Sequence, residues 1–178
     1  MNQTTTNIPS LYRDAMAKVA ASVHVITTDG EAGRYGITLT AISSVTDTPP
    51  TVLLCINQHA RIQPILRRNK HLCINVLSHT QQDVAEHFAG ITPISAAERF
   101  LQNNWETHPQ SAQPQLPGAL AHLHGHIINS HDIGTHSIFY VAIDHIHVTD
   151  THEQQALLYF QRQFMQTALL SKVPETVV

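Results

Sequence analysis

Two polar segments in the N-terminal third could together bind an anionic ligand. Ser43, Ser44 and Thr46 lie where the alternating apolar segment GITLTAISSVTDTPP loses its pattern, just before Pro49 and Pro50. Residues 57–61 (NQHAR) close the next apolar run and add an amide and a cation. Hydroxyls, amides and backbone N–H groups outside a ladder are the donors that phosphate recognition uses. The alternative is that both segments are solvated loops that cap adjacent strands, and these residues alone leave the choice open.

Histidines could bind a transition metal, because the chain contains 14 of them. His122, His124 and His126 alternate, so that they would project from one face of a strand, and His145 and His147 repeat the spacing. Three imidazoles on one sheet face can hold a transition metal. The alternative is a solvent-facing polar stripe on an amphipathic strand. Neither run contains Asp or Glu to complete a ligand shell, and we expect no metal site.

A third candidate is the segment DIGTHSIFYV. Gly134 and Thr135 predict a tight bend that places His136 at the first position of a strand. A polar side chain there can face a pocket at the rim of a barrel. The alternative is an ordinary turn with a partly exposed histidine.

The bulk composition limits the function classes. The 178 residues, 42% of them hydrophobic, fit a single domain over residues 1–178, with residues 1–9 expected to be a flexible N-terminus. The net charge of −3 gives no basic footprint for nucleic acid. We expect no membrane segment and no signal peptide, and hence a cytoplasmic protein. Cys55 and Cys73 lie in apolar runs and are expected to be buried, unreactive thiols.

Strands dominate the elements that must position these residues. A helix is predicted from an N-cap at Ser10 through residues 11–22, and further helices over 80–88 and after a capping box at Ser95 and Glu98. A short helical stretch over 61–68 is interrupted by Pro64. Residues 107–118 are expected to form a polar loop, and residues 156–164 to lead into a C-terminal helix. Strands are predicted at residues 23–28, from 36 to the turn at 47–50, and at 51–57, 71–77, 122–130 and 136–149.

Because few of these strands are separated by helical crossovers, the order favours a mainly β fold with helical insertions, an antiparallel barrel or sandwich, over a doubly wound sheet. No G-x-G-x-x-G motif and no Walker A motif is present.

Several motifs, taken in order, resemble the short-chain flavin reductases, and within them the branch that serves 4-hydroxyphenylacetate 3-monooxygenases. They are RDAMAKVAASVHVITTDGEAG, GITLTAISSVTDTPP, CINQHA, LCINVLS, HFAG, ERF with a following Trp, GTHSIF and LLYFQRQF. The resemblance extends from Tyr12 to Phe164. It implies a split β-barrel with the flavin reductase-like FMN-binding fold, in a homodimer with flavin sites near the subunit interface.

The resemblance also implies which residues contact cofactors. His136 matches the histidine of the family's Gly-Asp-His motif, associated with the nicotinamide nucleotide, although Thr135 replaces Asp here. Residues 73–78 would form part of the wall, and Tyr159, Phe160 and Arg162 match the closing motif. The cofactor contacts carried over are Thr38, Thr40, Ala41, Ser43, Ser44, Val45, Asn57, Gln58, His59, Ala60, Phe88, Ala89, His136 and Tyr159.

The function that the resemblance implies is hydride transfer from NADH, or NADPH, to FAD or FMN. The reduced flavin would leave for a separate monooxygenase component that hydroxylates an aromatic substrate. We expect no catalytic acid, base or nucleophile, because the protein only has to stack two cofactor rings. The alternative from a different class is a protein that keeps its flavin tightly bound, as a sensor or electron carrier.

Overall fold

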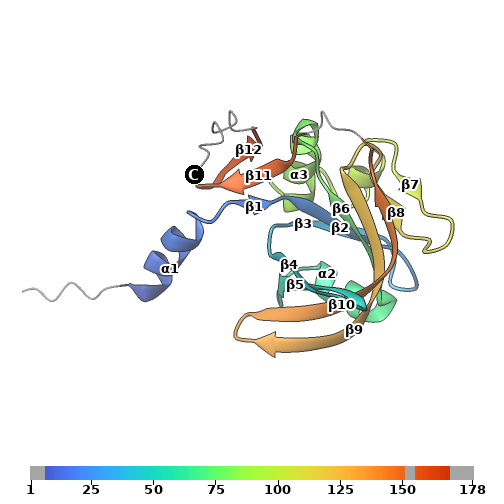
Figure 1. Cartoon of the computed structure of the whole chain (residues 1–178), viewed down its shortest axis with the longest axis horizontal. Coiled ribbons are helices and arrows are strands. Elements are labelled where there is room, and N and C mark those ends of the chain that lie inside the picture. Colours follow the sequence, from blue (N-terminus) through green and yellow to red (C-terminus); the bar gives the residue numbers. More distant parts are fainter. Residues whose placement is uncertain (1–6, 151–154, 169–178) are drawn as a thin grey trace, which may run out of the picture.

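The computed structural model describes residues 7–150 and 155–168 and is built around one curled sheet (Figure 1). Seven antiparallel strands pair in the order β3-β2-β6-β9-β10-β5-β4. The edge strands β3 and β4 do not pair, so the barrel is split, as the family resemblance implies. The strands are β2 (His24–Thr28), β3 (Tyr35–Leu39), β4 (Ile42–Asp47), β5 (Pro50–Asn57), β6 (His71–Val76), β9 (Ala121–Ile133) and β10 (His136–Val148).

Smaller elements surround this sheet. A second sheet joins β1 (Ala21–Ser22), β11 (Leu157–Phe160) and β12 (Gln163–Gln166), and a short ladder joins β7 (Glu106–Thr107) to β8 (Pro114–Gln115). The helices are α1 (Ile8–Met16), α2 (Ile62–Asn69) and α3 (Gln82–Ala89), with 3₁₀ turns η1 (His79–Gln81) and η2 (Glu98–Phe100). In Figure 1, α1 projects from the body on the side of the β11–β12 hairpin, and the long β9–β10 hairpin extends below it.

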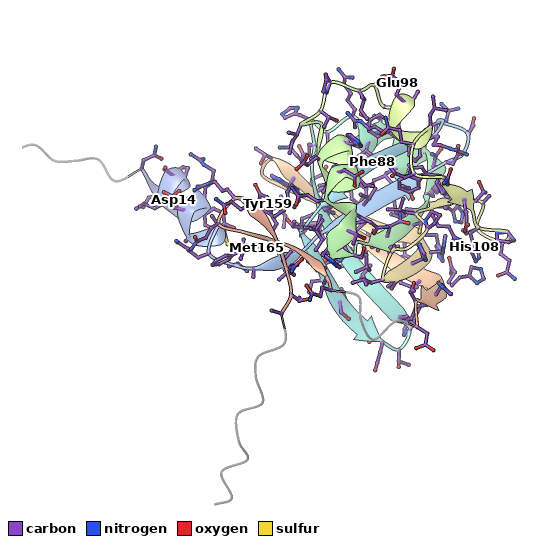
Figure 2. The ribbon with its side chains drawn as sticks, turned by 90° about the horizontal axis from the view of Figure 1, so that it is seen from above. Asp14, Phe88, Glu98, His108, Tyr159 and Met165 are labelled. Carbon is purple, nitrogen blue, oxygen red and sulfur yellow. The ribbon has the colours of Figure 1, made fainter. Side chains whose placement is uncertain are left out.

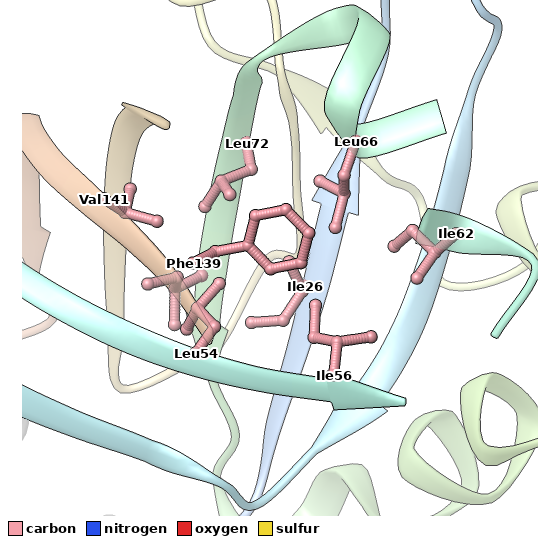
Figure 3. Close-up of a cluster of buried hydrophobic side chains, with 9 residues drawn as sticks. Ile26, Leu54, Ile56, Ile62, Leu66, Leu72, Phe139 and Val141 are labelled. Carbon is pink, nitrogen blue, oxygen red and sulfur yellow. The ribbon is translucent and has the colours of Figure 1, made fainter. Parts of the chain in front are cut away.

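Apolar side chains from several strands and from α2 fill the inside of the split barrel (Figure 3). Phe139 is 1% exposed and lies at the centre of this cluster. Burying one such large apolar side chain contributes about 1.5–3 kcal/mol to stability. The fully buried members are Ile26, Leu54, Ile56, Ile62, Leu66, Leu72, Ile74, Phe139 and Val141.

A second cluster packs α3 against the other end of the sheet. Phe88 lies on Gly36 of β3 and makes an edge contact with Phe100 and a tilted contact with Trp105, with ring centroids 5.1 and 5.2 Å away. A Cβ atom on Gly36 would come within 2.5 Å of the Phe88 ring. The close approach of α3 to β3 therefore requires glycine at this position.

Two helix predictions are wrong in detail. Asn7, and not Ser10, caps α1, since its Oδ1 accepts the Ser10 N–H at 3.3 Å, and α1 ends at Met16. Pro64 does not interrupt α2, because it lies in the first turn, where backbone N–H groups need no intrahelical acceptor.

The capping box is present, but a single 3₁₀ turn follows it. Ser95 N–H donates to Glu98 Oε2 at 2.7 Å, and Glu98 N–H donates to Ser95 Oγ at 3.3 Å. The expected second helix is therefore only η2.

One strand prediction, one prediction near the C-terminus and one loop prediction also change. Residues 36–47 form two strands and not one, because the chain leaves the sheet at Thr40 and Ala41. Residues 157–166 form the β11–β12 hairpin, and a helix beyond residue 168 would lie outside the described residues. The expected loop at 107–118 is partly ordered by β8, and its Gln113 and Leu116 are buried.

Part of the histidine stripe is buried, whereas His126 is half-buried and His147 is exposed. His122 and His124 are 4% and 1% exposed, because residues 106–118, which we call the strap, cover them. The His108 ring stacks on His124 with centroids 4.3 Å apart, and Ser111 Oγ lies 2.7 Å from His124 Nδ1. Within residues 7–150 and 155–168, no group of three or more His, Cys, Asp or Glu side chains could hold a metal ion.

Burial makes these imidazoles resist protonation. Burial, and then the neighbouring His108, His122 and His145, lowers the pKa of His124 to about 4. Burial likewise lowers the pKa of His122 and of His108. The other ionisable groups around the cluster are Cys73, whose pKa burial raises, and His71, Glu106, His126, Asp144, His145 and His147.

We expect the protein to lose stability between pH 7 and pH 5. Below pH 6.5, His124 takes up a proton in the unfolded chain but stays neutral in the folded protein, so acid favours unfolding. For this residue the loss of unfolding free energy at pH 5 is about 2 kcal/mol. Urea unfolding at several pH values measures the effect. His124→Gln should flatten the dependence, and His131→Gln, at the exposed hairpin tip, should not. A wild-type stability that is constant over this range would contradict the assignment.

In the part of the chain that the structure describes, no helix is both long enough and apolar enough to cross a membrane.

Candidate functional site

A groove of about 740 Å³ opens where the sheet is split. One wall is the crossing segment of Thr40, Ala41 and Ile42, and the opposite wall comes from α1, β1 and the β11–β12 turn. In Figure 2, the labelled Asp14 and Tyr159 lie close together on this side of the molecule. Cavities of 300–1,000 Å³ hold small molecules and cofactors. This volume therefore suits a ring system of cofactor size.

The groove exists because the chain crosses from one edge of the sheet to the other. The Ala41 carbonyl accepts the Cys55 N–H at 3.0 Å, which ties the crossing to β5, and the Ile42 N–H donates to the Thr40 carbonyl at 3.0 Å. Apart from these two bonds, Thr40 and Ala41 lie outside the strand ladders of the sheet. Thr40 is half-buried and Ala41 is exposed. Both therefore offer side chains and backbone to a bound molecule.

Two arginines make the groove attractive to anions. Arg13 comes from α1, and Arg162 from the β11–β12 turn. Arg162 Nη2 lies 2.6 Å from Asp14 Oδ1, an ion pair that connects that turn to α1. Guanidinium groups bind phosphate through paired N–H donors. The groove therefore combines an aromatic side chain, Tyr159, with cations that suit a nucleotide.

His24 also lines the groove and was missed by the sequence analysis. Burial lowers its pKa and outweighs the hydrogen bond between Nδ1 and the Leu39 carbonyl, 3.3 Å long, which raises it, so the ring is neutral at neutral pH. Arg13 was missed as well. Neither residue lies in a segment with an unusual pattern, and only their convergence in space identifies them.

The predicted contacts on α3 and β3 lie elsewhere. The Thr38 hydroxyl donates to the Ala85 carbonyl at 2.6 Å and so faces α3. Phe88 is 2% exposed and packs in the second core cluster, whereas Ala89 is exposed at the end of α3. These residues hold β3 in place, and β3 delivers Thr40 and Ala41 to the groove.

Ser43, Ser44 and Val45 lie on β4, the exposed edge strand. Ser43 is opposite Leu53 and Ser44 opposite Val52, with a bulge between Ser44 and Thr46. The strand therefore continues past Ser43 and Ser44 to Asp47, although its alternating pattern is lost there. β4 pairs on one side with β5, and as an edge strand it leaves its outward-facing N–H groups free of ladder bonds.

The second polar segment, residues 57–60, lies beside His136. Gln58 N–H donates to the Thr135 carbonyl at 2.9 Å, and Gln58 Nε2 to the His136 carbonyl at 3.3 Å. Asn57 is opposite His136 in the β5–β10 ladder, and its Oδ1 accepts the His59 N–H at 2.8 Å. His136 therefore begins β10, as the sequence predicts, and forms one polar group with residues 57–60.

An open antiparallel sheet with a cofactor-sized groove at its split, lined by two arginines, defines the class as a split barrel. The "Flavin reductase like domain" family matches residues 16–168. The 4-hydroxyphenylacetate 3-monooxygenase reductase component of Salmonella typhi is 47% identical over 163 residues, covering 92% of this chain and 94% of that protein.

Two further proteins agree. The FMN reductase (NADH) RutF of Stutzerimonas stutzeri is 44% identical over 86% of this chain and 85% of its own. The structure of the flavin reductase PheA2 superposes with a TM-score of 0.80 at 28% identity, covering 95% of this chain and 100% of PheA2. The chain therefore belongs to the flavin reductase-like family, and it is a flavin reductase.

Proposed function

We propose that this flavin reductase uses NADH to reduce free FAD or FMN and supplies the reduced flavin to a separate aromatic monooxygenase. A relative at 47% identity is named as the reductase component of 4-hydroxyphenylacetate 3-monooxygenase, which makes 4-hydroxyphenylacetate the first substrate to test in the partner. The observation that carries the proposal is the groove at the barrel split, with its crossing segment on one wall and two arginines on the other.

The residues of the groove fit a flavin nucleotide. We place the ring system along Thr40, Ala41 and Tyr159, where an aromatic side chain and uncovered backbone lie together. Ser43 and Ser44 lie next along the chain, on the edge strand, and would contact the ribityl or phosphate end. Arg13 and Arg162 would attract the phosphate groups that flavin and nicotinamide nucleotides carry.

The cofactors supply the chemistry, a hydride that passes from C4 of the nicotinamide to N5 of the flavin. The protein has to bind the two cofactors, orient their rings and exclude water from between them. His136, at the start of β10, would contact the nicotinamide nucleotide, with residues 57–60 beside it. Backbone N–H groups of the crossing and of β4 would support the negative charge of the reduced ring. His24, neutral at neutral pH, adds no charge to that wall.

The first expected result is NADH oxidation that depends on added free flavin. Purified protein is mixed with NADH and with FAD, FMN or riboflavin, and the loss of NADH absorbance is followed. Turnover with free flavin in excess over protein separates a reductase that releases its flavin from a carrier that keeps it. Failure of all three flavins to support oxidation would reject the proposal, and the same assay with NADPH determines the preferred reductant.

Ser44→Asp should lower the affinity for FMN and FAD about tenfold and the affinity for riboflavin much less. The new carboxylate would face the phosphate, and like charges near a protein surface repel by about 1–4 kcal/mol at contact distance. Thr48→Asp places the same charge four residues away on the exposed β4–β5 turn and is the control. Fluorescence titration with each flavin measures affinity. An equal loss of affinity for all three flavins would contradict the placement of the phosphate beside Ser44.

A homodimer is part of the proposal, and α1 supports it. This nine-residue helix buries no residue, and Ile8, Leu11 and Tyr12 are 67%, 53% and 64% exposed. Helices this short are marginal in water without a packing partner. A second copy that covers α1 would stabilise this wall of the groove and complete the site.

Leu11→Asp should therefore convert a dimer to a monomer, because a buried carboxylate without a partner is costly. Size-exclusion chromatography with light scattering gives the mass in solution, and Gln102→Asp, on an exposed loop, is the control. A monomeric wild type, or a dimer that Leu11→Asp leaves intact, would contradict this part. We also propose a cytoplasmic location, since the free thiols Cys55 and Cys73 suit a reducing compartment.

A further inference from the structure

The tip of the β9–β10 hairpin extends beyond the rest of the sheet. β6 pairs with β9 only from Ala121 to His126, so residues 127–133 have β10 as their one ladder neighbour among the described strands. A two-stranded ribbon is weakly held by its own backbone bonds. This tip carries the Gly134–Thr135 turn and therefore His136.

Arg67 attaches the tip to the body of the protein. It lies in the last turn of α2, where a cation is favoured by the helix dipole. Its Nη1 donates to Ser130 Oγ at 2.9 Å, and its Nη2 lies 2.9 Å from Asp132 Oδ1. These contacts cross more than sixty residues of sequence, and they reach the strand that enters the turn.

The same guanidinium also contacts the strand that leaves the turn. Arg67 Nη2 donates to Ser137 Oγ at 3.1 Å, and the Ser137 hydroxyl donates to Asp132 Oδ1 at 2.6 Å. Ser137 is fully buried, and the guanidinium carbon lies 5.1 Å from the centre of the Phe139 ring. Hydrogen bonds from Ser137, and the charge and hydrogen bonds of Arg67, lower the pKa of Asp132, which therefore stays ionised.

The other end of α2 holds the opposite side of the turn. The 57–60 segment leads directly into α2, and Gln58 binds the Thr135 and His136 carbonyls. At this end, Gln63 Nε2 donates to the Ile56 carbonyl at 2.9 Å. At the end where Arg67 lies, the Ile127 N–H donates to the carbonyl of Lys70, the C-cap of α2, at 2.8 Å. His136 therefore follows a turn that is held on one side by Arg67 of α2 and on the other by Gln58, in the segment that leads into α2.

We infer that Arg67 is a positioning residue that acts through His136 in the binding of NADH, an inference that rests on the proposed function. An exposed ion pair alone contributes little to stability. Here one planar cation binds three side chains on two strands and stacks on a fourth, so it fixes geometry. Lysine, a single point charge, could pair with Asp132 but could not reproduce the three contacts together.

The experiment compares steady-state kinetics of the full-length protein and its variants. Arg67→Ala should raise the KM for NADH about fivefold with kcat nearly unchanged, because a loosened positioning contact weakens binding and leaves the ring chemistry intact. Arg67→Lys should recover part of this loss. Arg68→Ala is the matched control, since Arg68 is the next residue of α2 and pairs instead with Glu31.

A double-mutant cycle tests whether the effect passes through His136. His136→Ala should raise the KM for NADH, and adding Arg67→Ala to it should raise that KM no further. Additive effects would overturn the inference, as would a wild-type KM in Arg67→Ala. If His136→Ala leaves KM unchanged while the wild type still oxidises NADH, the inference fails and the reductase function stands. If the wild type does not oxidise NADH, both fail.

Hydrogen exchange gives a readout that does not depend on turnover. Arg67→Ala should speed amide exchange in residues 127–137, and Arg68→Ala should leave exchange there as in the wild type. Unchanged exchange at the tip in Arg67→Ala would overturn the clamp even if KM rises.

Discussion

The ladder between β9 and β10 holds the two halves of the sheet together. β9 pairs with β6 on one side and β10 with β5 on the other, so the halves meet only through this hairpin among the described strands. Strands of this length must bend to curl the sheet, and bulges after Tyr140 and after Ile143 provide the bend. Gly125 allows it, because a Cβ there would lie 2.2 Å from the Ala142 carbonyl oxygen. A side chain at this position would uncurl the barrel.

The split of the barrel follows from this arrangement and creates the groove. Because β3 and β4 end the sheet on opposite edges, the chain has to cross between them at Thr40 and Ala41. A closed barrel would have paired those backbone groups in a ladder. The open one leaves them facing a cavity that α1 and the β11–β12 turn border. Edge strands invite aggregation unless they are covered. The binding site and the dimer interface that we propose at the split would therefore use a feature that is otherwise a liability.

Much of the fold could be predicted from local pattern, because it depends on local physics. Alternation and apolar runs located β2, β5, β6, β9 and β10, and turn chemistry located His136 at the start of β10. The division at Thr40 was missed, since the residues on both sides keep a strand-like pattern and only the sheet order forces the crossing. The burial of His122 and His124 was missed because it depends on the strap, whose polar composition predicts a solvated loop.

Some residues of the groove were predicted from the sequence and others were not. Thr40, Ala41 and Tyr159 lie in it and were expected as cofactor contacts from the family resemblance. His24 and Arg13 lie in the motif RDAMAKVAASVHVITTDGEAG, which carried the resemblance but no cofactor contact, and the partners of Arg67 lie more than sixty residues away along the chain. Tertiary contacts between distant, ordinary residues leave no periodic signal. Such residues could be found only once the fold had brought them together.

The β9–β10 hairpin has buried, neutral side chains near its base and exposed, charged side chains at its tip. Near its base, imidazoles are buried by the strap, and burial keeps them neutral, because an unpaired charge in that position would be costly. At its tip, Asp132 is 61% exposed as a side chain and Arg67 43%, so both stay charged and are held by geometry more than by attraction. The base resists movement through packing, whereas the tip is restrained by contacts that water can compete for. The end of the hairpin that presents His136 is therefore the end where contacts from α2, and not packing, have to supply the restraint.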